Sequence, residues 1–185
     1  MTLDPAMDGM GDVTVTLRPA DETTLGYVEA LLDANDLPSG DVREKPEVFF
    51  VASRDGGDGA GDERVGVGGI ETVSGATEVV GRVETVDGTD GSAGTTESPG
   101  LLRSVVVEQS VRGNGYGTAL CAALERRARA EGVETLYLLT TTADDFFAAR
   151  GFTEIERSDA PAGIRRTTEV ADLCPATATC MKKRL

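Results

Sequence analysis

The stretch Arg112-Gly113-Asn114-Gly115-Tyr116-Gly117 lies between an apolar run at residues 101–107 and a run with helical periodicity at residues 118–131. This order predicts a buried strand, a glycine loop and a helix. Glycines let backbone N–H groups approach an anion closely, and a helix N-terminus stabilises an exposed negative charge by about 0.3–1 kcal/mol. Arg112 would add a charge-assisted donor. The stretch therefore indicates a phosphate-binding loop; the alternative is a tight turn between strand and helix.

The 185 residues are enough for one domain with a real core. We expect a flexible N-terminus at residues 1–12 and a single domain at residues 13–185. The chain has no apolar run of about 18 residues, and its first residues do not resemble a signal peptide. These features favour a cytoplasmic protein.

Composition restricts the chemistry further. The chain has no histidine, so Ser-His-Asp and Cys-His catalysis are excluded. Its 3 cysteines form no C-x-x-C pair, which argues against a disulfide framework and a structural zinc site, and we expect no metal.

The net charge of −14 argues against nucleic acid or an anionic membrane as a partner. An acidic surface, few aromatic residues and scarce lysine resemble proteins of salt-accumulating halophiles, where high salt screens self-repulsion. An acidic protein from an ordinary cytosol is the alternative.

The hydrophobic periodicity predicts a mixed α/β fold. We expect strands near 13–18, 48–52, 65–73, 79–86, 101–107, 135–140, 153–157 and 176–182, and helices near 25–37, 118–131, 143–150 and 161–173. On the helix at 118–131 we expect a buried face of Ala119, Leu120, Ala123 and Leu124, with i,i+4 pairs Glu125→Arg129 and Arg127→Glu131. Two acidic, glycine-rich segments, near 55–63 and 86–100, are predicted to be loops.

Two motifs resemble the GNAT superfamily of N-acetyltransferases. The first is Arg112-x-x-Gly115-x-Gly117, which matches the family pattern R-x-x-G-x-G/A. The second, Ala143-Asp144-Asp145-Phe146-Phe147-Ala148-Ala149-Arg150-Gly151-Phe152, follows at about the family's usual spacing. The resemblance implies a GNAT-like, mostly antiparallel mixed sheet flanked by helices.

The resemblance also implies acetyl-CoA as the acyl donor. Backbone groups of Val105, Val106 and Val107 would bind the pantetheine arm. The pyrophosphate would bind at a loop made of Arg112, Gly113, Asn114, Gly115, Tyr116, Gly117 and Thr118.

Two positions depart from the family pattern. Phe147 stands where many members have a tyrosine whose hydroxyl protonates the leaving thiolate, and Thr140 stands where some members have an asparagine that contacts the cofactor. Phe147 and Thr140 are still expected at the cofactor, although Phe147 is equally consistent with an ordinary core residue.

Residues 101–107, 136–142 and 173–176 resemble a GNAT branch associated with arsenic-resistance operons. Other GNAT members near that branch acetylate the amino group of amino-acid-like toxins bearing a phosphinate or an arsenical, so we expect a small amine as the acceptor. The expected partners are therefore a small-molecule amine and, as an open option, a second copy of the chain.

Without histidine, the general base must be a carboxylate. Glu71 is our candidate because it closes a strand of small residues, 66–70; a solvent-facing glutamate is the alternative. We expect the oxyanion donor to be a backbone N–H near Val105. Arg103, inside an apolar strand, is either a clamp for an anionic substrate group or a paired structural ion.

The cysteines leave a further option. Cys174 and Cys180 are soft thiols that could bind trivalent arsenic, although two buried thiols near the last strand are the favoured interpretation; Cys121 is expected in the core. The sequence thus predicts an acetyl-CoA-dependent N-acetyltransferase of a small amine. A non-catalytic acyl-CoA-binding module and a thiol-based metalloid-binding protein are the alternatives.

Overall fold

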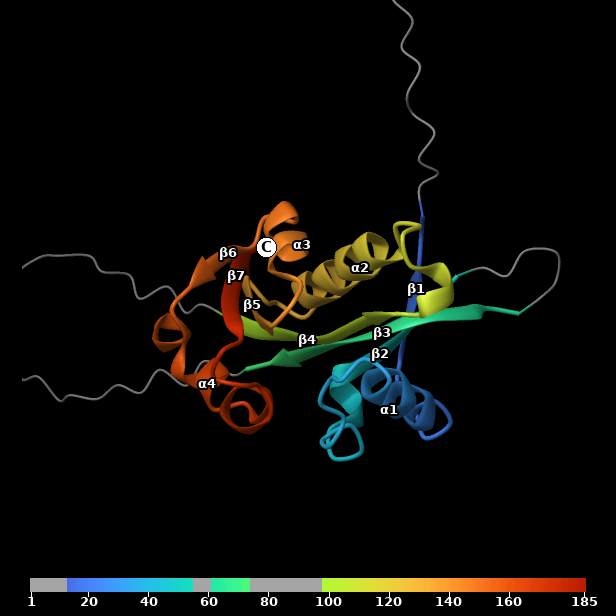
Figure 1. The fold of residues 1–185 in the computed structure, drawn as a ribbon, viewed down its shortest axis with the longest axis horizontal. Coiled ribbons are helices and arrows are strands. Elements are labelled where there is room, and N and C mark those ends of the chain that lie inside the picture. Colours follow the sequence, from blue (N-terminus) through green and yellow to red (C-terminus); the bar gives the residue numbers. More distant parts are fainter. Residues whose placement is uncertain (1–12, 55–60, 74–97) are drawn as a thin grey trace, which may run out of the picture. The chain divides into compact units, whose positions relative to one another are not determined.

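A computed structural model describes residues 13–54, 61–73 and 98–185 of the chain. Its strands are β1 (Thr16–Pro19), β2 (Phe49–Arg54), β3 (Glu63–Thr72), β4 (Pro99–Val107), β5 (Thr135–Thr140), β6 (Thr153–Ile155) and β7 (Thr179–Arg184). Its helices are α1 (Leu25–Asp33), α2 (Tyr116–Ala130), α3 (Asp144–Ala149) and α4 (Ala162–Arg165). Short turns of 3₁₀-helix, η1 (Pro46–Val48), η2 (Gln109–Val111) and η3 (Arg157–Asp159), and a π-helical turn, η4 (Glu169–Leu173), complete the chain (Figure 1).

The strands follow the order β1-β2-β3-β4-β5-β7-β6. Neighbours pair antiparallel at β1–β2, β2–β3, β5–β7 and β6–β7, and β4 pairs with β5 in parallel. The predicted mixed, mostly antiparallel sheet is therefore confirmed, and β4 is the fourth of its seven strands. Among the described residues, no helix has both the length and the apolar character needed to cross a membrane.

The chain divides into two compact units. The first comprises Met1–Gly69 and Ser104–Leu124, and the second comprises Ile70–Arg103 and Glu125–Leu185. Each is described by itself below.

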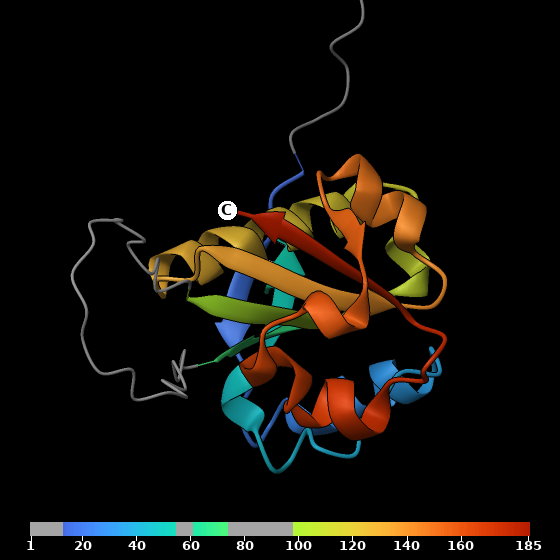
Figure 2. The same ribbon diagram turned by 90° about the vertical axis from the view of Figure 1, so that its left-hand side faces the viewer.

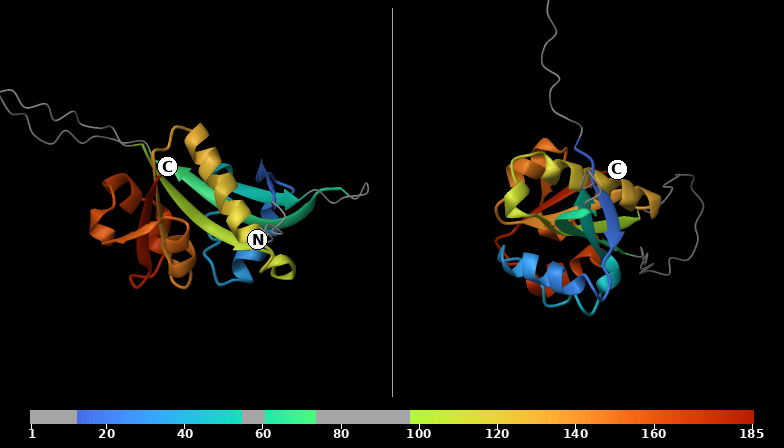
Figure 3. Two further views of the ribbon diagram at one scale, coloured as in Figure 1. Left: turned by 90° about the horizontal axis from the view of Figure 1, so that it is seen from above. Right: turned by 90° about the vertical axis from the view of Figure 1, so that its right-hand side faces the viewer.

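In the first unit, helices cover both faces of the strands. Leu25, Val28 and Leu32 repeat at helical spacing along α1 and pack with buried residues of β2, β3 and β4. On the opposite face, α2 packs closely on β3: a Cβ at Gly68 would lie 2.5 Å from the end of the Leu124 side chain, which would have to shift to admit it. Figure 3 shows α2 crossing these strands.

In the second unit, β5, β7 and β6 lie side by side (Figure 2). The core of this unit is a cluster of buried residues from β4, β5 and β7 and from the segments around α4 and η4: Leu101, Tyr137, Ala160, Ile164, Val170 and Cys180. Gly132 and Gly151, with φ of +84° and +87°, follow α2 and α3 and end these helices.

Several predicted details were wrong. Glu125 does not pair with Arg129 but is buried against Arg150 and Lys183, at 3.0 and 2.8 Å, whereas the exposed pair Arg127–Glu131 is confirmed at 2.6 Å. Tertiary partners thus outweigh helix-surface spacing at a buried carboxylate.

Element boundaries also differ. The helix predicted at 161–173 is two short turns, α4 and η4, and the strand predicted at 153–157 ends at Ile155. Glu63 and Gly100, assigned to loops, lie in β3 and β4, and Ala119 is only half-buried. The predictions for residues 1–12, for the strand at 79–86 and for most of the two acidic loops fall outside the described residues.

Candidate functional site

The loop between β4 and α2 presents backbone N–H donors. Gly113 and Gly115 adopt left-handed backbone conformations, with φ of +80° and +84°, on either side of Asn114. In the described part of the chain, the N–H groups of residues 113–118 make no backbone hydrogen bond of good geometry, and residues 112–115 form a turn. The first later donor with a well-aligned backbone partner is Ala119, which bonds the Gly115 carbonyl at 3.0 Å. Left-handed residues in a turn gather N–H groups into a concave anion site, and α2 begins directly behind it.

Side chains hold this loop in place. Arg112 donates through Nε to the Val107 carbonyl at 3.0 Å and through Nη2 to Oδ1 of Asn35. Asn35 in turn donates to the Leu31 carbonyl of α1 at 2.7 Å. The Asn114 amide donates to the Val111 carbonyl at 3.2 Å. The Arg112 guanidinium, expected as a phosphate donor, is therefore bonded to the protein itself.

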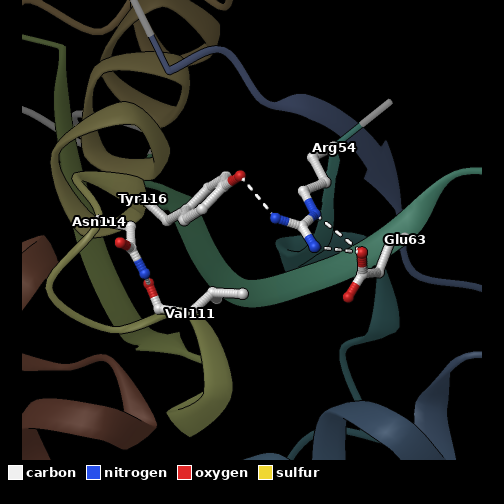
Figure 4. A network of polar contacts seen from close by, with 5 residues as sticks. All are labelled: Arg54, Glu63, Val111, Asn114 and Tyr116. Carbon is white, nitrogen blue, oxygen red and sulfur yellow. Dashed lines mark hydrogen bonds and ion pairs between the residues drawn. The ribbon is translucent and has the colours of Figure 1, made fainter. Parts of the chain in front are cut away.

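Tyr116 is the first residue of α2 and anchors it to the β2–β3 hairpin (Figure 4). Arg54 at the end of β2 donates through Nη1 to the Tyr116 hydroxyl at 3.1 Å and through Nε to Glu63 at 2.8 Å. The sequence analysis did not identify Arg54 or Glu63, because no local pattern links residues that lie 62 positions apart. Gly117 and Thr118 lie in the first turn of α2.

The strand that leads into the loop alternates between its two faces. Val106 is buried in the core beneath α1, while Val105 and Val107 are half-buried. The carbonyl of Val106 approaches β3 closely, since a Cβ at Gly66 would lie 2.4 Å from it. The small residues of β3 therefore serve packing at Gly66 and Gly68.

Glu71 and Arg103 lie together in the second unit. The Arg103 side chain is 0% exposed, forms an ion pair with Glu169 at 2.7 Å and donates a hydrogen bond to Glu71 at 3.5 Å. Glu71 keeps 14% of its side chain exposed. The geometry favours the interpretation of Arg103 as a paired structural ion. Sequence reasoning missed Glu169, because the π-helical turn that carries it was predicted as ordinary helix.

Two thiols of this unit, those of Cys174 and Cys180, have raised pKa values. Cys174 donates through Sγ to Glu169 at 3.3 Å, and burial, with a smaller contribution from the Glu169 charge, raises the pKa of the Cys174 thiol to about 12. Burial also raises the pKa of Cys180. Cys121 is in the core, as predicted. Within the described ranges, no group of three or more His, Cys, Asp or Glu side chains could hold a metal ion.

Thr140 and Phe147 both make structural contacts. The Thr140 hydroxyl accepts a hydrogen bond from the Ala143 N–H at 2.9 Å, just before α3. The Phe147 ring is buried and packs edge-to-face on Phe146 and Phe152, with centroids 5.2 and 5.6 Å away. These contacts are those of a core aromatic residue.

Comparison with known families settles the relationship of the chain. The model of the acetyltransferase (GNAT) family matches residues 18–154. The chain belongs to this family. The match includes the β4–α2 loop and the motif that ends at Phe152, the two regions that carried the resemblance in the sequence.

Curated relatives match a shorter segment. An amino-acid acetyltransferase of Ectopseudomonas mendocina (strain ymp) is 41% identical over 63 residues, which cover 33% of this chain and 15% of that protein. An amino-acid acetyltransferase of Ralstonia nicotianae is 34% identical over 70 residues, covering 38% and 16%. The matched segment thus spans only 15–16% of the length of these curated relatives.

Solved structures share the fold. N-acetylglutamate synthase from Neisseria gonorrhoeae, complexed with coenzyme A and N-acetyl-glutamate, superimposes with a TM-score of 0.67 at 19% identity, over 94% of this chain and 36% of that one. Rv2747 from Mycobacterium tuberculosis, in complex with CoA, gives 0.64 at 21% identity, over 92% and 99%. The predicted GNAT-like fold of this chain is therefore confirmed.

Proposed function

We propose that this protein is an N-acetyltransferase that transfers the acetyl group of acetyl-CoA to the amine of a small molecule. One observation carries the proposal: in a GNAT-family chain, two glycines with left-handed backbone, Gly113 and Gly115, lie directly before the N-terminus of α2. Such a loop suits a pyrophosphate.

The residues present fit acetyl-CoA as a substrate. Residues 112–118 would bind the pyrophosphate, and the half-buried faces of Val105 and Val107 leave the strand before the loop accessible to the pantetheine arm. The bound thioester supplies an activated acetyl group. The CoA complexes of the two structural neighbours support this assignment.

Acetyl transfer requires that the amine loses a proton, that its nitrogen bonds the thioester carbon, and that the thiolate leaves. In a chain without histidine, we assign deprotonation to Glu71, directly or through water. A backbone N–H near Val105 would stabilise the negative charge on the carbonyl oxygen. The thiolate is a fair leaving group, because a free thiol has a pKa of about 8.5.

For the acceptor, we propose an amino-acid-like amine. The matches to amino-acid acetyltransferases and to the complex with N-acetyl-glutamate support this class. A more specific acceptor is an amino-acid-like toxin with a phosphinate or an arsenical, and this proposal is supported only by the resemblance to the arsenic-resistance branch.

Release of free CoA thiol tests the proposal. The protein is mixed with acetyl-CoA and a panel of amines in multimolar KCl, and the product is identified by mass. Thiol release that depends on one class of amine, with the acetylated amine as product, is expected. Tight acetyl-CoA binding without turnover for any amine would instead support a non-catalytic acyl-CoA-binding module, which the hydroxyl-free Phe147 makes the second candidate.

A further inference from the structure

Ser104 has an unusual backbone for a residue inside a strand. Its φ is +56°, and among the described residues the only other non-glycine residue with a positive φ is Asp36, in the turn after α1. The left-handed region is unfavourable for any residue with a Cβ. Glycine would occupy this position without strain.

The Ser104 hydroxyl adds a second cost. The residue is 8% exposed, and its Oγ makes no hydrogen bond to any described part of the protein. A buried hydroxyl without a partner is destabilising, whereas alanine would leave nothing unsatisfied. Neither the backbone nor the packing therefore explains why serine stands here. Backbone strain and unpaired polar groups persist in native proteins chiefly at functional sites.

Ser104 also lies on the strand that leads to the proposed phosphate-binding loop. It immediately precedes Val105–Val107, and at about 3.3 Å per residue the strand carries the chain about 10 Å from Ser104 to Val107 before the loop begins. In acetyl-CoA, the pantetheine arm likewise separates the thioester from the pyrophosphate. A donor bound with its pyrophosphate at residues 112–118 and its arm along β4 would bring the thioester toward Ser104.

We propose, resting on the acetyltransferase function above, that Ser104 is a catalytic residue whose hydroxyl donates a hydrogen bond to the reacting thioester. As the amine nitrogen bonds the carbonyl carbon and the carbon–sulfur bond breaks, negative charge develops first on oxygen and then on sulfur. The hydroxyl stabilises that charge without giving up its proton. The amine proton goes to the base, and the thiolate is protonated by solvent. The hydrogen bond from such a donor is stronger in the transition state than in the bound substrate. It therefore raises kcat more than it raises the affinity for acetyl-CoA.

Two substitutions separate catalysis from structure. Ser104→Ala removes the hydroxyl and keeps the strain, and Ser104→Gly removes both. We expect kcat to fall about tenfold or more in both variants, as for the loss of a transition-state donor. The dissociation constant of acetyl-CoA should stay within about threefold of wild type. Ser104→Gly should have a higher melting temperature than Ser104→Ala, because glycine removes the backbone strain. The more stable of the two variants should therefore still show the reduced kcat. The fold-loss should not vary between about pH 6 and 9, because serine does not titrate there.

Equilibrium binding identifies the atom that accepts the hydrogen bond. Affinity for CoA is measured at about pH 9.5, above the thiol pKa of about 8.5, with desulfo-CoA as the control. Weaker binding of CoA by both variants, with unchanged desulfo-CoA binding, places the hydroxyl at sulfur. Unchanged CoA binding together with the kcat loss places it at the carbonyl oxygen.

Three outcomes would overturn the proposal. Unchanged kcat in both variants removes Ser104 from the reaction, and a kcat loss that follows a loss of stability or of acetyl-CoA binding shows a structural role. If Ser104→Ala does not fold, Ser104→Gly carries the test alone. A wild-type protein that neither binds acetyl-CoA nor releases CoA overturns the acetyltransferase function and this proposal with it; an active wild type with active variants overturns only this proposal.

Discussion

Arg112 donates a hydrogen bond through Nη2 to the side-chain oxygen of Asn35, a residue 77 positions earlier in the chain. Its Nε bonds the Val107 carbonyl, and Asn35 is itself bonded to the Leu31 carbonyl of α1. A planar guanidinium can make such divergent bonds in fixed directions, and a lysine cannot. The arginine of the loop motif thus joins the end of β4 to the end of α1.

We predict that Arg112 positions the loop rather than neutralising phosphate charge. Arg112→Lys should then weaken acetyl-CoA binding about as much as Arg112→Gln. Asn35→Ala should weaken it too, with a double-mutant coupling of about 0.5–3 kcal/mol. Calorimetric titration measures each affinity. Near-normal binding by Arg112→Lys, together with no effect of Asn35→Ala, would assign Arg112 to the phosphates instead.

Gly115 is predicted to be essential for acetyl-CoA binding. Its φ of +84° disfavours any side chain, and a Cβ there would also lie 3.7 Å from Val13. Gly115→Val should raise the dissociation constant at least about tenfold, which corresponds to about 1.4 kcal/mol. Gly132→Val is the matched control, because Gly132 has the same φ of +84° with nothing within 4 Å and lies outside the loop. Equal losses in both variants, or none in folded Gly115→Val, would contradict the assignment.

The strand–loop–helix unit could be predicted from the sequence because its signals are local. Residues 101–107 are mostly apolar, glycines alternate with other residues at positions 113, 115 and 117, and the periodicity of α2 follows directly. The partners of charged groups could not be predicted. Glu125 has an arginine at i,i+4, yet it pairs with Arg150 and Lys183, 25 and 58 residues away.

The same limit applies at the candidate site. The sequence does not decide whether Arg103 binds an anionic substrate group or forms a structural ion pair. Its partner Glu169 lies in a segment whose sequence resembles ordinary helix. Ser104 carries no sequence signal of its left-handed backbone, since glycine or asparagine is the residue expected there. Local pattern thus predicted the strand, loop and helix, and tertiary contacts decided the partners of the charged and polar side chains.

Glu71 is predicted to assist deprotonation of the amine. Glu71→Gln should lower kcat at neutral pH with acetyl-CoA binding unchanged, and the loss should shrink as pH rises toward the pKa of the amine. Glu154→Gln, at an exposed glutamate of β6, is the control. The pH profile of kcat measures the effect. Because Glu71 lies 3.5 Å from the buried Arg103, melting temperatures must accompany the kinetics. Wild-type rates at every pH would remove Glu71 from the mechanism.

Cys174 is predicted to be a poor nucleophile and to destabilise the fold at alkaline pH. Its pKa rises from 9.0 to about 12 on folding, so between these values the unfolded chain loses the proton while the folded protein keeps it. Stability should therefore be unaffected below pH 9 and fall as pH rises toward 12. Denaturant midpoints of wild type and Cys174→Ser measure this, and the variant should show the smaller decline.

Thiol labelling gives an independent check on Cys174. A disulfide reagent at pH 8 should modify Cys174 slowly in the folded protein and rapidly in denaturant, because the thiolate is the reacting form. Rapid modification of the folded protein would show an ionised thiol. Stabilisation by arsenite that disappears in a Cys174→Ser, Cys180→Ser double variant would revive the metalloid-binding alternative.

Salt is predicted to stabilise this protein. A net charge of −14 on one small domain repels itself, and the screening length falls from about 10 Å at 0.1 M to about 3 Å at 1 M salt. Exposed ion pairs such as Arg18–Asp62 weaken in salt, but each contributes only about 0–1 kcal/mol to stability. The screening of repulsion between like charges therefore dominates the effect of salt. The melting temperature should rise steeply from dilute buffer to molar KCl and then more slowly through salting-out.

Sucrose is the control for this salt dependence, because it strengthens burial without screening charge. It should reproduce the slow part of the rise and not the steep part. Since chloride competes weakly with phosphate for the loop at residues 112–118, acetyl-CoA affinity should not increase in parallel with stability. A melting temperature that stays flat between 0.1 and 2 M KCl would contradict adaptation to high salt and leave the acetyltransferase proposal intact, because the loop geometry does not depend on the net charge.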